Sequence, residues 1–294
     1  MSKSKRKILI QFDGDEHPSV FDRVVAVDAG AEAVFAYGGV APERVQPLVH
    51  GAIFTRGAAD LKHTAIFIGG SDVAQGEALL ASVKKTFFGP MRVSVMLDAN
   101  GANTTAAAAV LAAGRHLDLA ATTALVLGGT GPVGLRAARL LAGQGARVRL
   151  ASRSLERAKA AAKAVNEVCA GERVEACAPQ GEKELTEALA AVQLVIATGA
   201  TGVELLSAEV RKKAQALRVA IDLNAVPPAG IQGVDVMDKA TDREGVIAYG
   251  AIGVGGTKMK IHKAAIRQLF ERNDQVLDAE EIYELGRKIL GNSG

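Results

Sequence analysis

Cysteine is almost absent from this sequence. Cys169 and Cys177 are the only two cysteines among 294 residues. This excludes a fold held together by disulfides, and it excludes a zinc site built from four cysteines. So few thiols are typical of a protein from a reducing compartment, and we expect a cytoplasmic protein.

The sequence also lacks an excess of charge of one sign and long apolar runs. The 35 basic and 32 acidic residues leave a net charge of +3, which is too balanced for a nucleic-acid-binding protein. The longest apolar run, near residues 106–113, is far shorter than the roughly 20 residues that cross a bilayer. A basic cluster at residues 3–7 precedes only three apolar residues, so it is no signal peptide. We therefore expect neither a nucleic-acid partner nor a membrane-spanning segment.

The length and apolar content predict two globular domains. At roughly 150 residues per domain, 294 residues correspond to two domains. Hydrophobic residues make up 49% of the chain and charged residues 23%, which is ordinary for a globular protein that buries a core without staples. Tryptophan is absent, aromatic residues reach only 4% and glycine contributes 32 residues, a composition that favours layered α/β packing.

Residues 1–117 alternate strand-like and helix-like stretches. Apolar strands are predicted at residues 7–12, 52–55, 64–68 and 92–97. Helices are predicted at residues 71–87, capped by Ser71 or Asp72, and at residues 103–115. Strands separated by helices indicate a parallel sheet.

Residues 118–256 repeat this pattern as a second unit. Buried strands are predicted at residues 122–127, 147–151, 192–198, 217–223 and 246–249, with helices at residues 132–143 and 154–169 and one capped by Ser207. Residues 250–256 (GAIGVGG) are interpreted as a hinge, and two helices follow without a further strand. We expect residues 257–294 to return to the first domain. The predicted fold is α/β, a Rossmann-type doubly wound parallel sheet plus a second α/β domain completed by the C-terminal helices.

A glycine-rich loop follows the first strand of the second domain. Gly129, Gly131 and Gly134 form a GxGxxG pattern between a buried strand and a helix. In this context the glycines permit a tight turn, close backbone approach to a pyrophosphate and close packing of helix on strand, while the helix N-terminus binds phosphate. Pro132 suits the first helical turn. The candidate cofactor-binding residues are Gly129, Thr130, Gly131, Pro132, Val133 and Gly134; the alternative is a glycine-rich turn in a plain α/β domain.

The end of the next strand predicts which dinucleotide binds. An NAD site usually has Asp or Glu there, whereas this sequence has Ser152 and Arg153, and Arg153 lies 19 positions after Gly134. A guanidinium matches the 2′-phosphate of NADP, Ser152 can donate to it, and Arg157 adds charge one helical turn later. We expect NADP, with NAD possible; the alternative is that Arg153 is a solvated residue at a helix start.

Two later strands end in small or polar residues at the same predicted sheet edge. Thr198, Gly199 and Ala200 follow one strand, and Asn224 follows another. Ligands of open α/β sheets bind beyond the carboxyl ends of strands, so these four residues are candidate cofactor contacts.

Motifs from both domains carry a family resemblance. The segments are QFDGDEHPSVFD (11–22), TAIFIGG (64–70), FFGPMRVSVMLDANGANTTAAA (87–108), GGTGPVGLRAA (128–138), GAIGVGGTKMKIHKA (250–264) and DAEEIYEL (278–285). In this order they resemble the bacterial NAD(P)-dependent methylene-tetrahydromethanopterin dehydrogenases of formaldehyde-oxidising one-carbon metabolism. The resemblance implies hydride transfer from the methylene bridge of the reduced pterin to NADP or NAD, giving the methenyl pterin. It also implies a homo-oligomer.

The implied reaction needs little acid–base machinery. The methylene carbon lies between two nitrogens, and loss of hydride leaves a cation shared by both, so no proton has to leave that carbon. Catalysis then depends on holding two rings in contact, and we expect a cleft between the two domains. The five histidines are scattered without close metal-like spacing, so no metal site is predicted.

The resemblance assigns the pterin to the first domain and a catalytic lysine to Lys258. From spacing alone Lys258 is an exposed helix residue; the family has a lysine here that contacts the pterin. His262 lies one turn further and could share its face. Polar residues after two strands are candidate pterin contacts: Asp98, Asn100, Asn103 and Thr104, and also Asp13 and His17. Asn103 or Thr104 could instead cap the following helix, and Asp13 and His17 could belong to a plain turn.

Two other functions fit the same pattern. A methylene-tetrahydrofolate dehydrogenase shares the chemistry and the two-domain organisation. A non-catalytic NADP-binding sensor needs the glycine loop and Arg153, but neither Lys258 nor Asp98.

Overall fold

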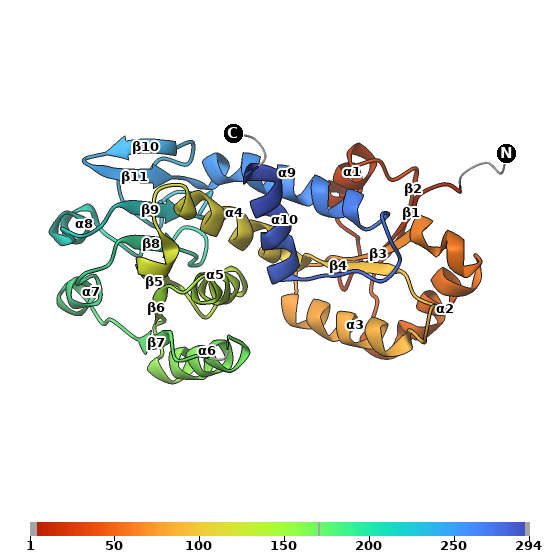
Figure 1. The fold of residues 1–294 in the computed structure, drawn as a ribbon. Coiled ribbons are helices and arrows are strands. Elements are labelled where there is room, and N and C mark those ends of the chain that lie inside the picture. Colours follow the sequence, from red (N-terminus) through yellow and green to blue (C-terminus); the bar gives the residue numbers. More distant parts are fainter. Residues whose placement is uncertain (1–4, 170, 292–294) are drawn as a thin grey trace. The chain divides into compact units, whose positions relative to one another are not determined.

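The computed structural model describes residues 5–169 and 171–291, and the chain forms two compact units (Figure 1). One contains the residues up to Thr104 together with those from Met259 onward, and the other is Thr105–Lys258. Helices α4 (Ala102–Gly114) and α9 (Ala251–Gln268) each begin in one unit and continue into the other. The division near residue 104 falls inside α4, whereas the sequence analysis put the boundary at residue 117.

The first unit is built on a five-stranded parallel sheet of order β12-β4-β3-β1-β2. In register, Ile8 of β1 pairs with both Ala33 of β2 and Thr64 of β3. Strands β3 and β4 are buried along their whole length, as expected for central strands covered on both faces. The strands are β1 (Ile8–Phe12), β2 (Ala33–Tyr37), β3 (Thr64–Ile68), β4 (Ser94–Leu97) and β12 (Val276–Leu277).

Helices cover both faces of this sheet. Figure 1 shows α2 (Gln46–Phe54) and α3 (Val73–Thr86) on one face and α1 (Val20–Asp28) with the second half of α9 on the other. Ser19 caps α1 through the amide of Asp22, and Asp72 caps α3 through the amides of Ala74 and Gln75. Short 3-10 turns connect the elements at Pro42–Arg44, Ala58–His63 and Ala99–Gly101.

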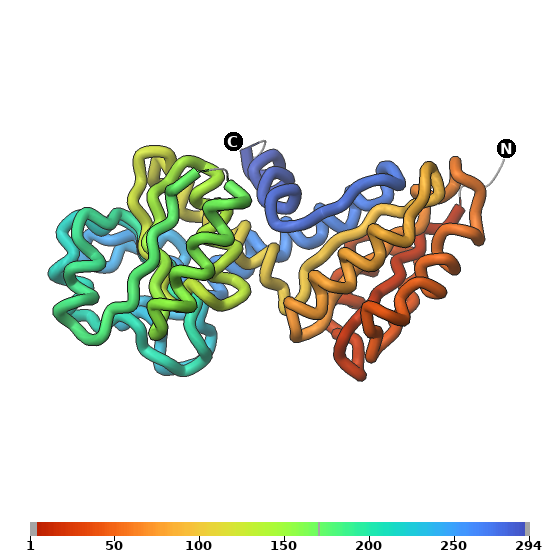
Figure 2. The backbone as a smooth tube through the Cα atoms, turned by 90° about the horizontal axis from the view of Figure 1, so that it is seen from below, coloured from red at the N-terminus to blue at the C-terminus, as the bar shows by residue number. Residues whose placement is uncertain are grey.

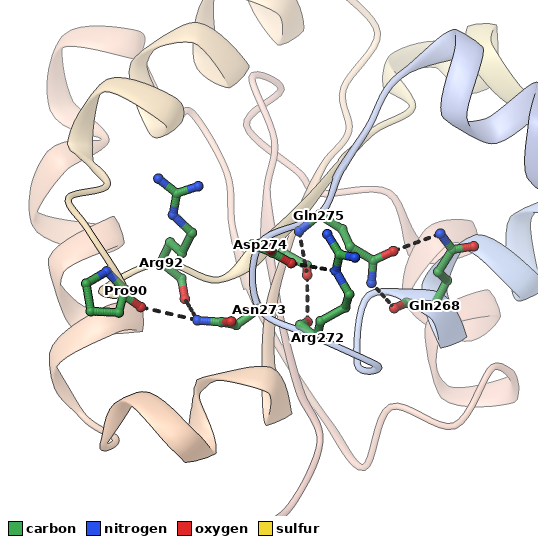
Figure 3. A network of polar contacts seen from close by, with 8 residues as sticks. Pro90, Arg92, Gln268, Arg272, Asn273, Asp274 and Gln275 are labelled. Carbon is green, nitrogen blue, oxygen red and sulfur yellow. Dashed lines mark hydrogen bonds and ion pairs between the residues drawn. The ribbon is translucent and has the colours of Figure 1, made fainter.

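The C-terminal segment completes the first sheet. In Figure 2 its blue trace runs beside the orange and yellow N-terminal trace, and β12 pairs in parallel with β4 before α10 (Ala279–Gly291) begins. Figure 3 shows how the preceding loop is attached: the Asn273 amide donates to the carbonyls of Pro90 (3.2 Å) and Arg92 (3.0 Å). Gln275 and Gln268 bond to each other through their side chains (2.7 Å).

Three predictions for this unit were wrong. Residues 52–55 are the end of α2 and its cap rather than a strand, because an apolar run of this length fits a buried helix equally well. Strand β2 was not predicted; it lies at the sheet edge and is only partly buried, so its pattern is weak. A short strand, β12, lies between the two C-terminal helices. The sequence did not reveal it, because it has only two residues and is defined by its pairing with β4.

The second unit has a seven-stranded sheet of order β10-β11-β9-β8-β5-β6-β7. The order from β7 to β11 is that of a doubly wound dinucleotide-binding fold, and every pairing in it is parallel; only β10 is antiparallel. The predicted fold class is therefore confirmed. The strands are β5 (Thr123–Leu127), β6 (Arg147–Ala151), β7 (Val174–Cys177), β8 (Leu194–Ala197), β9 (Val219–Asp222), β10 (Lys239–Arg243) and β11 (Val246–Tyr249).

Four further helices pack on this sheet. Figure 1 shows α5 (Pro132–Gly143) and α6 (Leu155–Val168) on one face and α7 (Glu182–Ala188) and α8 (Ala208–Lys213) on the other, with a short turn at Leu119–Ala121 before β5. On the α7–α8 side a buried core joins the strands to the helices, as between Val195 of β8 and Val210 of α8. Ser154 and Ser207 cap α6 and α8, as predicted.

The glycine-rich segment at residues 250–256, expected to be a hinge, is helical from Ala251 onward and forms the start of α9. A Cβ on Gly250 would collide with the backbone at Asp235, and one on Gly253 with the carbonyl of Asp238. These glycines therefore allow a close approach of two backbone segments, which is a packing requirement and not a need for flexibility.

Candidate dinucleotide and substrate sites

The glycine loop joins β5 directly to α5, at the switch point where the strand order reverses between β5 and β8. Gly128 has a φ of 70°, Gly131 is the N-cap residue and Pro132 stands at the first helical position. The first amides of α5, including those of Val133 and Gly134, have no partner within the helix. Together with the helix dipole they form a site for an anionic group.

Steric contacts explain the glycines of this loop. A Cβ on Gly129 would lie 2.7 Å from Cγ of Leu150, and one on Gly134 would lie 2.6 Å from Oγ1 of Thr198 and 2.7 Å from Cα of Gly129. Only glycine fits at both positions. The backbone of the loop is thereby packed closely against Leu150 of β6 and against Thr198, as is typical of loops that bind a pyrophosphate.

The end of β6 adjoins the loop, as the sequence predicts. Oγ1 of Thr130 lies 3.3 Å from Oγ of Ser152, which links the loop to the residue after β6. Arg153 and Arg157 are both exposed, the former directly before α6 and the latter in its first turn. Two exposed cations therefore follow β6 at the start of α6.

Thr198 fixes the loop from the neighbouring strand. Its hydroxyl donates to the carbonyls of Leu127 (2.9 Å) and Gly128 (3.2 Å). Gly199 is packed against Leu205, whereas Ala200 is exposed. The hydroxyl of Thr198 is thus occupied in holding the turn between β5 and α5.

The amide of Asn224 is also used by its own loop. Its Nδ2 donates to the Pro228 carbonyl (3.0 Å) and its Oδ1 accepts from the Val226 amide (3.1 Å). The sequence analysis did not single out Asp222, whose buried carboxylate accepts hydrogen bonds from the amides of Asn224 and Ile231. Burial raises the pKa of Asp222 above its ordinary value, against the opposing effect of these amides.

In the first unit, four loops meet at the carboxyl edge of the sheet. The amide of Val40 donates to the Asp13 carbonyl (3.0 Å), linking the loops after β2 and β1. The Ser71 hydroxyl donates to Asp15 (2.7 Å), and the Asn100 amide donates to the Gly70 carbonyl (2.6 Å). This edge is where a parallel α/β sheet binds its ligand.

Three predicted pterin residues are internal to this edge. The Asp98 carboxylate is fully buried and accepts the amide (3.0 Å) and the hydroxyl (2.7 Å) of Thr104. The buried Asn103 amide donates to the Leu97 carbonyl (2.6 Å) and to Asp278 (2.9 Å). Neither Asn103 nor Thr104 caps α4, because both lie inside the helix; the Asp98 carboxylate accepts the free amide of Thr104 at its start.

Asp13 is buried in the same way, whereas two other candidates face solvent. The Asp13 carboxylate accepts the amides of Asp15 (3.0 Å) and Ser19 (3.2 Å) and organises the loop after β1. His17 is exposed on that loop, and Asn100 is exposed on the turn after β4 with a φ of 53°. Of the six predicted pterin residues, these two are available to a ligand.

Comparison with known proteins decides the family. Residues 20–100 match the family described as methylene-tetrahydromethanopterin dehydrogenase, N-terminal, and residues 116–231 match one described as putative NAD(P)-binding. A Methylorubrum extorquens protein named bifunctional protein MdtA is 46% identical over 288 residues, which is 97% of this chain and 99% of the relative. Another from that organism, named NAD(P)-dependent methylenetetrahydromethanopterin dehydrogenase, is 32% identical over 295 residues, with the same coverage. The chain belongs to the methylene-tetrahydromethanopterin dehydrogenase family.

The fold of this family member is shared with two solved dehydrogenase structures. The structure of quinate dehydrogenase from Corynebacterium glutamicum in complex with NAD matches 98% of this chain and 100% of that chain, with a TM-score of 0.54 at 12% identity. A shikimate 5-dehydrogenase from Mycobacterium fortuitum matches 96% of this chain and 98% of its own, also with a TM-score of 0.54, at 13% identity. The second unit of this dehydrogenase is an NAD(P)-binding domain.

The lysine implied by the resemblance lies on α9. Lys258 is half-buried and Lys260 is exposed, since two residues along a helix point to different sides. The residue that sequence reasoning underrated is His262, one turn after Lys258, which is buried in the first unit of the dehydrogenase. Its signal was a lone polar ring on an apolar helix face.

The described part of this dehydrogenase shows neither a metal-binding cluster nor a helix that could span a membrane. In residues 5–169 and 171–291 no group of three or more histidine, cysteine or carboxylate side chains is arranged to hold a metal ion. Over the same ranges, no helix has both the length and the apolar character to span a membrane.

Proposed function

We propose that the protein oxidises methylene-tetrahydromethanopterin to the methenyl form, with NADP as the preferred acceptor and NAD as a second one. The observation that carries this proposal is 32% identity, over 97% of this chain, to a relative named NAD(P)-dependent methylenetetrahydromethanopterin dehydrogenase. The glycine loop of the second unit supports it independently, because side chains at Gly129 and Gly134 would clash, as in loops whose backbone approaches a pyrophosphate.

The second unit binds and orients the dinucleotide. When bound, NADP supplies a nicotinamide ring that accepts a hydride. The loop of Gly129, Gly131 and Gly134 and the first amides of α5 hold the pyrophosphate. Ser152, Arg153 and Arg157 hold the 2′-phosphate, since a guanidinium matches phosphate geometry. Thr198 keeps the loop in shape through its bonds to Leu127 and Gly128.

The first unit binds the pterin through its exposed edge residues. His17 and Asn100 are available to the ring and tail of the carrier, while the buried groups keep their loops in place. Asp13 orders the loop that carries His17, and Asp98 with Thr104 orders the turn that carries Asn100. Asn103 ties the same turn to the start of α10.

Lys258 is the proposed catalytic residue. Losing a hydride leaves a cation shared by two pterin nitrogens, and an ammonium group directly beside that cation would oppose the reaction. Lys258 therefore acts on a more distant atom, by donating to a pterin carbonyl and fixing the angle of the ring. No general base is needed, because no proton leaves the reacting carbon.

A second carrier is a specific candidate. The relative at 46% identity is named bifunctional, which supports testing a second activity in this chain. Methylene-tetrahydrofolate carries the same reacting carbon between two nitrogens, so the same contacts would serve it.

We also propose a homo-oligomer that works in the cytoplasm in formaldehyde oxidation. The surface of α1 exposes Val20, Phe21, Val24 and Val27, and the edge strand β2 exposes Phe35 and Tyr37. An exposed apolar stripe beside an unpaired strand edge favours association with a second copy. Light scattering of the purified protein tests this; a monomer at all concentrations would contradict it.

The proposed reaction is tested with purified protein, both carriers and both dinucleotides. We expect NADPH to form only when a methylene carrier is added, with the higher kcat/KM for methylene-tetrahydromethanopterin. Higher kcat/KM for methylene-tetrahydrofolate would favour the second candidate. Tight NADP binding without turnover of either carrier would identify a sensor and contradict the proposed function.

A further inference from the structure

His262 is buried in the first unit and lies near two aromatic rings. Only 1% of its surface is exposed. Its imidazole stacks on Phe67 of β3, with centroids 5.6 Å apart and planes 16° apart, and the ring of Phe21 on α1 lies 6.4 Å away. An apolar ring would fill this space at no electrostatic cost, whereas an imidazole there must be desolvated. A buried histidine at this position is therefore expected to interact with a polar group.

One polar neighbour of His262 is Asp98. Nδ1 of His262 lies 3.9 Å from Oδ2 of Asp98, and both side chains are buried. The same Oδ2 accepts the Thr104 hydroxyl, while Oδ1 accepts the Thr104 amide. A buried carboxylate is stable only where donors and positive charge compensate for lost hydration. Thr104 supplies two donors from one side, and His262 approaches the oxygen from α9.

The Asp98 carboxylate spans one short turn, Ala99–Gly101, because it binds the amide and hydroxyl of Thr104 on the far side of that turn, and the Thr104 hydroxyl also contacts the Gly101 carbonyl (3.4 Å). The Gly101 amide donates to the Asp98 carbonyl (2.9 Å), and the Asn100 amide donates to the Gly70 carbonyl (2.6 Å). Asn100 itself is exposed with a φ of 53°, a conformation that costs free energy unless its surroundings enforce it. The position of Asn100 therefore depends on the Asp98 carboxylate being fixed.

We propose that His262 is a positioning residue of the pterin site: through Nδ1 it fixes Asp98, and through Asp98 it fixes the turn that presents Asn100 to the carrier. His262 itself touches no substrate. This inference rests on the proposed function, because it assigns the turn to pterin binding.

Three substitutions separate the ring nitrogens from the ring shape. His262→Asn retains a donor at the position of Nδ1, and His262→Gln moves the donor to the position of Nε2. His262→Phe keeps a flat ring on Phe67 and removes both nitrogens. Phe67→Leu is the matched control, because it removes the stacked ring and leaves the His262–Asp98 pair intact.

The readout is the KM for each substrate, with the melting temperature of each variant. We expect His262→Phe and His262→Gln to raise the KM for methylene-tetrahydromethanopterin about tenfold while the KM for NADP stays within about twofold. His262→Asn should stay within about threefold of wild type for the pterin. Phe67→Leu should lower the melting temperature and leave both KM values unchanged.

Several results would overturn the inference. One is a wild-type KM for the pterin in His262→Gln or His262→Phe. Another is an equal rise of the pterin KM in all three His262 variants, and a third is a parallel rise of the KM for the pterin and the KM for NADP. A pterin KM in Phe67→Leu as high as in His262→Phe would also do so, since packing would then explain it. If His262→Phe does not fold, the comparison of Asn with Gln decides alone. Absence of wild-type turnover would remove the proposed function and this inference together, whereas normal turnover with unaffected KM removes only the inference.

Discussion

The hydroxyl of Thr198 lies so close to Gly134 that it leaves no room for a side chain there: a Cβ at position 134 would lie 2.6 Å from Oγ1 of Thr198. The two residues belong to different elements, the end of β8 and the first turn of α5. Their contact sets how closely the cofactor helix approaches the sheet. A methyl group at position 134 must therefore displace either the hydroxyl or the helix.

Gly134→Ala should weaken NADP binding and lower the melting temperature. The displaced contact costs about 1–3 kcal/mol in overpacking, and the helix N-terminus moves from the pyrophosphate. Gly143→Ala is the matched control, because Gly143 lies in the last turn of α5 with no atom near its Cβ position. Calorimetric titration with NADP measures the effect; equal affinity in the two variants would contradict it.

Arg153→Ala should raise the KM for NADP at least tenfold and leave the KM for NAD within about twofold. A charge-assisted contact to the 2′-phosphate is typically worth about 1.5–3 kcal/mol, and NAD lacks that phosphate. Arg157→Ala should act in the same direction with a smaller effect, since it lies one turn further along α6. Steady-state kinetics with both dinucleotides tests this, and an equal change for NAD and NADP would reject the phosphate assignment.

Lys258→Ala should reduce kcat about a hundredfold, because it removes a preorganised donor that fixes the angle of the pterin ring. Lys260→Ala is the control, because that side chain is exposed on a different side of α9. Affinity for NADP should be unchanged in both variants. A Lys258→Ala enzyme with wild-type kcat would leave this residue without a catalytic role.

The Cys177 thiol should be unreactive at neutral pH. Burial raises its pKa to about 11; the nearby Arg149 lowers it and Glu175 raises it further. A raised pKa means that less thiolate is present at about pH 8, and only the thiolate is alkylated. In a Cys169→Ser background, iodoacetamide should modify Cys177 at least tenfold more slowly than a small free thiol. Unfolding should restore the ordinary rate; fast modification of the folded protein would contradict this.

The second unit could be predicted from sequence because its signals are local. Ala124–Leu127 of β5 is a buried apolar run, the glycine pattern follows at once, and Ser154 and Ser207 are cap residues. Each of these features is decided within a few residues. The nonlocal features were missed: β12 exists only by pairing with β4, and Gly250 and Gly253 are required by the backbone at Asp235 and Asp238.

The position of the polar residues at the carboxyl edge of the first sheet could be predicted from the sequence, but the burial of each side chain could not. A polar cluster after β4 correctly indicates the carboxyl edge of the sheet. Nothing in the sequence shows that Asp98 turns inward to Thr104 or that His262, far along the chain, lies 3.9 Å from it. Whether a polar group binds a ligand or its own backbone is decided by tertiary packing, and the outcome here separates exposed Asn100 from buried Asp98.

Isotope transfer tests the central claim most directly. Methylene-tetrahydromethanopterin prepared from fully deuterated formaldehyde carries deuterium only on its methylene carbon. Incubated with this protein and NADP, it should give NADPH that contains one deuterium per molecule, measured by mass spectrometry. Unlabelled NADPH, or none, would show that no hydride passes from the pterin methylene carbon to the dinucleotide.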